Sequence, residues 1–173
     1  MSGEANQATG PYPVPTRGKA YGRLGRTVGA MDILEIDRVM VATPDAAAAA
    51  ERFEELLGLH FGDVVDSETD VGGDVQRNEV TYAEPGIELV APAAEDSGVA
   101  AFLEANGPGL FGLVVRVADV DAARAELAEQ GVEPIADETP DGVRELHYHP
   151  EDFGGVYTLL TAYPHPGFAR AWE

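Results

Sequence analysis

The chain has 173 residues, of which 45% are hydrophobic, 24% are charged and none is cysteine. This length suits one domain or two small fused modules, and the lack of cysteine excludes disulfides, a thiolate nucleophile and thiolate metal ligands. The formal net charge is −20, with +3 in residues 1–30 and therefore −23 in residues 31–173. Because so acidic a body repels polyanions, we expect neither nucleic acid nor an anionic membrane as a partner.

The two ends of the chain carry no pattern of a folded element. No apolar run approaches the roughly 20 residues that span a bilayer, and residues 1–6 lack the apolar core of a signal peptide, so we expect a cytoplasmic protein. Residues 1–30 are rich in glycine, proline and small polar residues. We interpret them as an extended or flexible arm, either disordered or clasping a second subunit. We expect residues 164–173 to form a C-terminal tail.

Residues 33–92 carry strand and helix signals in the order β-α-β-β-β. Alternating apolar and β-branched residues predict strands, and Thr43 or Asp45 is placed to cap a helix that ends at Gly58. The sequence Glu-Pro-Gly at 84–86 predicts the turn of a hairpin. The expected elements are strands over 33–42, 60–65, 75–83 and 87–91 and a helix over 46–57.

Residues 109–163 repeat the same order of elements. The expected elements are strands over 111–117, 132–135, 144–149 and 156–161, with a helix that begins after 119–121 and ends at Gly131. A helical linker over 97–106 joins the two units. Because four strands cannot bury a sheet face alone, two such units must pair. We therefore predict an α+β domain over 31–163, in which paired βαβββ modules form a mixed, curved eight-stranded sheet with flanking helices.

Four short motifs follow one another from the middle of the chain to its end. They are 87–92 (Ile-Glu-Leu-Val-Ala-Pro), 96–97 (Asp-Ser), 109–112 (Gly-Leu-Phe-Gly) and 149–160 (His-Pro-Glu-Asp-Phe-Gly-Gly-Val-Tyr-Thr-Leu-Leu). The ordered set resembles the vicinal oxygen chelate superfamily, which has the glyoxalase fold, and within it the methylmalonyl-CoA epimerase family. The resemblance covers about residues 34–163. It implies a homodimer that moves a proton next to a thioester carbonyl with the help of a divalent metal ion.

The positions that hold the metal in this family are mostly changed here. Arg38 stands where the family has a first-strand histidine, Gly112 where it has a fifth-strand histidine and Leu159 where it has an eighth-strand glutamate. Only Glu88, on the fourth strand, is kept. A catalytic divalent ion needs about three protein ligands, so we expect no metal and no other cofactor. The glutamate replaced by Leu159 is also one of the family's two bases, and Glu79 matches the other.

The alternation of strand residues assigns side chains either to the helices or to a cleft. Residues assigned to the cleft, two of them on an ambiguous strand, are Arg38, Met40, Glu79, Thr81, Glu88, Arg116, Arg144 and Tyr148. Several arginines in one cleft predict an anionic substrate. We expect catalysis from Glu79, Arg38 and Glu88. We expect substrate binding from Arg116, Arg144, Tyr148, Met40 and Thr81.

A guanidinium in place of the metal can stabilise an enediolate, and a half-buried Glu79 can act as a base on a carbon acid. We therefore predict a metal-independent isomerase, epimerase or lyase that removes a proton next to the carbonyl of an anionic small molecule, with acyl-CoA as one candidate. One alternative is that Arg38 and Glu88 form a salt bridge that fills the metal's place without chemistry. Another is a non-catalytic binding protein that sequesters a small molecule. His147 and His149 suggest a pair of metal ligands, but the alternation of the strand places both side chains away from the cleft.

Overall fold

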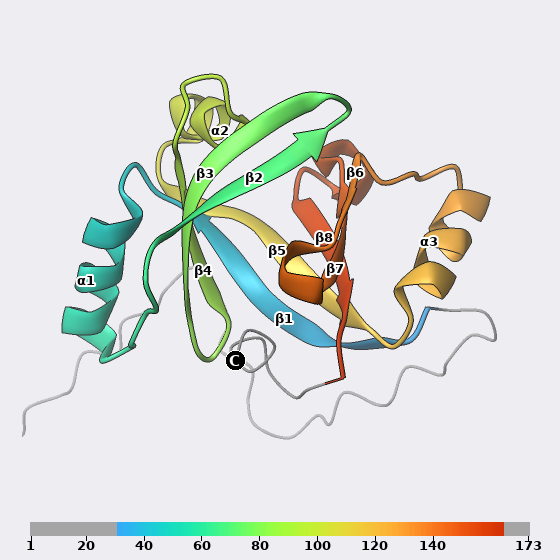
Figure 1. Ribbon diagram of the computed structural model, residues 1–173, viewed down its shortest axis with the longest axis horizontal. Helices are drawn as coiled ribbons and strands as arrows, with labels where there is room; N and C mark the ends of the chain where they lie inside the picture. The colour runs from blue at the N-terminus through green and yellow to red at the C-terminus, as the bar shows by residue number, and fades with distance from the viewer. Residues whose placement is uncertain (1–30, 165–173) are drawn as a thin grey trace, which may run out of the picture.

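The computed structural model describes residues 31–164, and Figure 1 shows their arrangement. The elements are β1 (Ile33–Ala42), α1 (Ala46–Leu57), β2 (Val65–Val71), β3 (Asp74–Ala83), β4 (Ile87–Pro92), α2 (Gly98–Asn106), β5 (Gly109–Val117), α3 (Val120–Glu129), β6 (Ala136–Glu138), η1 (Pro140–Gly142), β7 (Arg144–Tyr148), η2 (Pro150–Phe153) and β8 (Tyr157–Ala162). The expected arm over 1–30 and the tail beyond 164 lie outside the described residues. Within the described range, no helix combines the length and apolar character that a bilayer crossing requires.

The strands form one mixed eight-stranded sheet in the order β2-β3-β4-β1-β5-β8-β7-β6. Each half contains one parallel pair, β1 with β4 and β5 with β8, and the halves join where β1 runs antiparallel to β5. The sheet curls so far that β2 and β6, at its opposite edges, come into contact. There the Asp70 amide donates a 2.8 Å hydrogen bond to Oε1 of Glu138. The predicted pair of βαβββ modules in one curved sheet is confirmed.

The helices begin and end where the capping residues predict. The Asp45 carboxylate accepts a hydrogen bond from the Ala48 amide at the start of α1, and Gly58 ends this helix with a left-handed φ of 69°. Asp119 caps α3 in the same way. In Figure 1, α1 lies beside the β1–β4 half and α3 beside the β5–β8 half. Each helix covers an apolar cluster on its half of the sheet, because burying that face is what holds an amphipathic helix on it.

The first hairpin differs from the expectation. The polar segment 66–74, expected as a loop, contains most of β2 and the turn at Gly72 and Gly73, and β2 pairs with β3 from Val65 opposite Val80 to Val71 opposite Asp74. Strand propensity depends strongly on context, and a polar edge strand is stable when its backbone pairs with a longer neighbour. This hairpin supplies one wall of the cavity described next.

Candidate functional site

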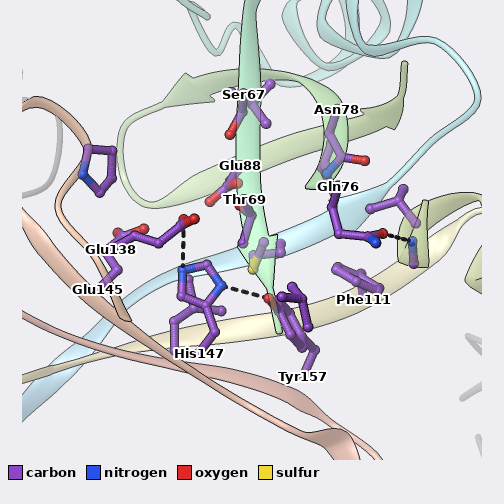
Figure 2. A pocket seen from close by; sticks show the side chains of 18 of the residues that line it. Ser67, Thr69, Gln76, Asn78, Glu88, Phe111, Glu138, Glu145, His147 and Tyr157 are labelled. Carbon is purple, nitrogen blue, oxygen red and sulfur yellow. Dashed lines mark hydrogen bonds and ion pairs between the residues drawn. The ribbon is translucent and has the colours of Figure 1, made fainter. Parts of the chain in front are cut away.

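A cavity of about 370 Å³ lies inside the curved sheet, between its two halves. This central cavity is shown in Figure 2, where polar side chains from both halves converge on it. The lining residues that matter below are Arg38, Met40, Asn78, Tyr82, Glu88, Phe111, Glu138, Glu145, His147, Tyr157 and Leu159. A concave, partly apolar space with a few converging polar groups is the usual form of a small-molecule site.

Arg38 lines the central cavity and binds carboxylates from both halves of the sheet. Its Nε donates to Glu88 of β4 at 2.6 Å, its Nη2 to Glu145 of β7 at 2.8 Å and its Nη1 to Asp37 at 2.9 Å. We call these four residues the Arg38 cluster. The arginine is only 3% exposed, and a charge so deeply buried needs partners of this kind.

The electrostatics of the Arg38 cluster follow from its burial. Burial alone would lower the pKa of Arg38, but the carboxylates of Glu88 and Glu145 outweigh it and raise the pKa, so the guanidinium stays charged. Burial raises the pKa of Glu88, opposed by Arg38 and assisted by the charges of Glu145 and Asp37. Three carboxyl groups surround the one guanidinium, which weakens the positive potential that Arg38 offers to an anion.

A second polar group lines the wall of the cavity and comes from three neighbouring strands. Nδ1 of His147 (β7) lies 2.6 Å from the hydroxyl of Tyr157 (β8), and Nε2 lies 3.7 Å from Oε2 of Glu138 (β6), as the dashed lines in Figure 2 mark. Burial lowers the pKa of His147, which favours the neutral ring. Burial and the charge of Glu138 raise the pKa of Tyr157, so the phenol stays protonated.

Two buried polar atoms in the cavity wall have no hydrogen-bond partner within residues 31–164. They are Oδ1 of Asn78 and Nε2 of His147. Buried polar atoms are nearly always hydrogen-bonded, and an exception needs an explanation. Since both atoms belong to residues that line the cavity, a ligand that hydrogen-bonds to them would supply the missing partner.

The predicted cleft residues divide into those that line the cavity and those that do not. Arg38, Met40 and Glu88 line it, as expected. On β3 the predicted parity is wrong, because the even-numbered residues, with Val80 and Tyr82 among them, face the cavity. Glu79 is exposed on the other face. Thr81 is fully buried there, and its hydroxyl donates to the Gly62 carbonyl at 2.8 Å.

The parity predicted for β7 is also wrong. Arg144 binds Asp121 and Asp137 outside the cavity, and Tyr148 is fully buried in the core beneath α3. Glu145 and His147 therefore face the cavity, and the sequence analysis missed both.

Arg116 is also placed elsewhere. It pairs with Glu35 at 2.8 Å and lies over the ring of Tyr163. Of the arginines within residues 31–164, Arg38 alone lines the cavity. The arginine-rich anion site predicted from the sequence is therefore wrong.

The residues at the family's metal positions do not fit a metal ion. The Arg38 guanidinium occupies the first position, and Leu159 at the last packs with Met40 and Val114 in an apolar cluster. At Gly112 there is no space for any side chain, because a Cβ would collide with the backbone carbonyl oxygen of Tyr157. Within residues 31–164, no group of three or more histidine, aspartate and glutamate side chains is arranged to hold a metal.

Metal analysis tests this misfit directly. We expect protein purified without chelator to carry well under one divalent ion per chain. We also expect Co²⁺, Mg²⁺ or EDTA to leave the melting temperature unchanged, since a ligand stabilises a fold only by binding it. Stoichiometric metal, or a melting temperature that falls with EDTA and recovers with one ion, would contradict the prediction.

The fold agrees with comparisons to known proteins. Residues 37–148 match the Glyoxalase/Bleomycin resistance protein/Dioxygenase superfamily, and the chain belongs to it. Within it, the chain is similar to the ethylmalonyl-CoA/methylmalonyl-CoA epimerase of Cereibacter sphaeroides, with 35% identity over 130 residues that cover 72% of this chain and 95% of that protein. The resemblance predicted from the motifs is confirmed.

Solved structures of methylmalonyl-CoA epimerases have the same fold. The enzyme from Mycobacterium tuberculosis is 31% identical, with a TM-score of 0.58 over 76% of this chain and 88% of that one. A variant of the Streptomyces coelicolor enzyme, in complex with 2-nitronate-propionyl-CoA, is 26% identical, with a TM-score of 0.60 over 79% of this chain and 100% of that one. The similarity therefore extends over nearly the whole length of these relatives.

Proposed function

We propose that this protein is an acyl-CoA isomerase of the epimerase type, which moves a proton at the carbon next to the thioester carbonyl without a bound metal ion. The relatives support the acyl-CoA, since they are epimerases of ethylmalonyl-CoA and methylmalonyl-CoA. The observation that carries the metal-independent part is the Arg38 guanidinium, which is buried at the family's metal position and lines the central cavity. A homodimer and a cytoplasmic location, both expected from the sequence, stay predictions.

Arg38 would take over the electrostatic part of the metal's role. Removing a proton next to a carbonyl leaves an enolate, and a fixed cation near the developing oxygen charge lowers the barrier. A guanidinium remains charged at every relevant pH. The surrounding carboxylates weaken this effect, but they also hold the guanidinium in one orientation. Epimerisation is favoured over a lyase reaction because the relatives are epimerases.

The charge of the cavity lining limits which acyl groups can bind. Within the described chain, the lining contains one arginine and four glutamates, which are Glu68, Glu88, Glu138 and Glu145. A free carboxylate on the acyl group, as in a malonyl thioester, would meet like charge there, which disfavours its binding. We therefore propose that the substrate is anionic through its CoA phosphates and carries an uncharged, 2-branched acyl group.

Hydrogen exchange in D₂O tests the proposed function. The protein should introduce deuterium at C2 of a 2-methylacyl-CoA such as 2-methylbutanoyl-CoA, and do so faster than at C2 of methylmalonyl-CoA. Mass spectrometry measures the exchange, and chiral analysis of the acid measures the inversion. The control is the same assay without protein. No exchange above this background in either thioester would contradict the proposal.

One observation favours a second function, the sequestration of a small molecule. Besides the four glutamates, the lining contains the aromatic rings of Tyr82, Phe111 and Tyr157. Carboxylates together with aromatic faces attract organic cations. The Arg38 cluster would then be a filled, inactive metal site. Tight calorimetric binding of an aromatic cation, together with no exchange of any acyl-CoA, would favour this function over the isomerase.

A further inference from the structure

The wall of the central cavity holds a histidine whose two nitrogens are in different situations. Nδ1 of His147 has a partner in the Tyr157 hydroxyl at 2.6 Å. Nε2 is buried, has no hydrogen bond within residues 31–164 and lies 3.7 Å from the Glu138 carboxylate. That separation is too long for a hydrogen bond, but a positive charge on the ring would still be stabilised by the carboxylate. Nε2 therefore lacks a hydrogen-bond partner among the described residues, in a residue that lines the cavity.

The protonation states follow from the surroundings of the ring. The neutral imidazole favoured by burial carries one proton, and when this proton is on Nδ1 it is donated to the Tyr157 oxygen, which leaves a lone pair on Nε2. The charged groups facing His147 are Glu145, Glu138 and Asp137, which raise its pKa, and Arg38, which lowers it. Since Tyr157 stays a neutral phenol, its own proton can be donated to a ligand oxygen.

The position of His147 in the sheet adds an independent argument. On β8, Leu159 stands where the methylmalonyl-CoA epimerase family has its second base. His147 on β7 is the direct strand-pairing partner of Leu159. Both residues line the central cavity. A proton acceptor is therefore absent from one strand and present on the adjacent strand, one strand spacing away.

We propose that His147 and Tyr157 are the proton-transfer pair of this cavity, an inference that rests on the proposed function. The C2–H bond of the acyl thioester breaks, its proton forms a bond with Nε2 of His147, and the electron pair moves into the carbonyl to give an enolate. The Tyr157 hydroxyl donates a hydrogen bond to the enolate oxygen. The reverse step returns a proton, exchanged with solvent, to C2. Glu138 acts as a positioning residue that stabilises the imidazolium, and the Asp70 amide holds its carboxylate.

Substitutions of the pair test the proposal in the D₂O exchange assay. His147→Asn and Tyr157→Phe should each lower C2 exchange by about 10²–10⁴-fold, the usual contribution of a general acid or base, with the Kd for the acyl-CoA changed less than about threefold. The matched control is His149→Asn, which replaces a half-exposed histidine outside the cavity lining and should leave exchange unchanged. Circular dichroism and melting curves check that each variant folds. If His147→Asn does not fold, Tyr157→Phe decides.

Two further measurements separate a chemical role from a structural one. Burial lowers the pKa of His147 from its ordinary value. Exchange by the wild-type protein should fall as the pH drops through this lowered pKa, because a protonated ring cannot accept a proton. The ¹⁵N chemical shifts of the His147 ring near neutral pH should show a neutral imidazole protonated at Nδ1. A ring protonated at Nε2 would overturn the assignment of the base.

The outcomes of the exchange assay are distinguishable. Wild-type exchange that is unchanged by His147→Asn and Tyr157→Phe overturns this pair and leaves the proposed function standing. A wild-type protein that exchanges no acyl-CoA overturns both. Loss of exchange in both variants, with retained binding and an unaffected His149→Asn control, supports the pair.

Discussion

Replacing Arg38 by methionine is expected to lower the free energy of unfolding by about 3–5 kcal/mol, the usual effect of removing one partner from a buried ion pair. The substitution leaves Asp37, Glu88 and Glu145 without their shared cation, and their side chains are only 1%, 5% and 7% exposed. Urea denaturation at neutral pH measures the change. Glu88→Gln in the same background should recover part of the lost stability, because it removes one uncompensated charge.

The pH dependence of the Arg38→Met variant follows from Glu88. Burial already raises the pKa of Glu88 and Arg38 opposes this, so removing Arg38 raises that pKa further. A carboxyl with a raised folded-state pKa contributes stability at low pH and loses it as the pH rises through that pKa. The deficit relative to wild type should therefore grow from acidic to neutral pH.

Arg52→Met is the matched control for this substitution. Arg52 pairs with Glu55 at the surface of α1, with side chains 65% and 67% exposed, and such pairs contribute less than about 1 kcal/mol. An Arg38→Met variant no less stable than Arg52→Met would mean that water reaches the carboxylates of the Arg38 cluster.

Replacing Gly112 by alanine is expected to destabilise the fold by about 1–3 kcal/mol, as overpacking does in a well-packed interior. Gly112 on β5 pairs with Tyr157 on β8, and the added methyl group would collide with the Tyr157 carbonyl oxygen. Because the colliding atom belongs to the backbone of β8, the collision can be relieved only if the parallel strands β5 and β8 move apart. Thermal and urea denaturation measure the effect.

Gly109→Ala, on the same strand, is the matched control. A Cβ at Gly109 meets no atom within 4 Å, so this variant should stay within about 0.5 kcal/mol of wild type. Equal stability of the two variants would show that β5 and β8 separate easily. If the expected difference is found, a histidine at Gly112 is excluded for the same steric reason, and a single substitution cannot restore that metal ligand.

The fold could be predicted from the sequence because its signals are local. The cap at Asp45 and the stop at Gly58 delimit α1, and the repeat of βαβββ units requires the two halves to pair. On β1, Arg38 and Met40 lie on the predicted side, because Val41 packs in the apolar cluster with α1 and the alternation of the strand then turns Arg38 and Met40 toward the cavity.

Two strands of the site could not be predicted from polarity alone. On β3, apolar character alone favours the helix side for Val80 and Tyr82, but both line the cavity, because its wall is itself apolar there and includes Val90 and Val99. On β7, Glu145 to Tyr148 are all buried, so neither face is marked by exposure. Only the pairing with β8, which puts His147 opposite Leu159, decides which face meets the cavity.

The contact between β2 and β6 and the acidic residues beside it protect the edges of the sheet against pairing with another chain. A sheet edge with free amides and carbonyls invites strand addition by another molecule, which is a route to aggregation. Here the two edges of the sheet lie against each other, and the Asp70 amide is occupied by Glu138. The exposed acids Asp66, Glu68 and Asp70 along β2 would repel the same edge of a second copy. Their negative charge therefore disfavours edge-to-edge association where β2 and β6 meet.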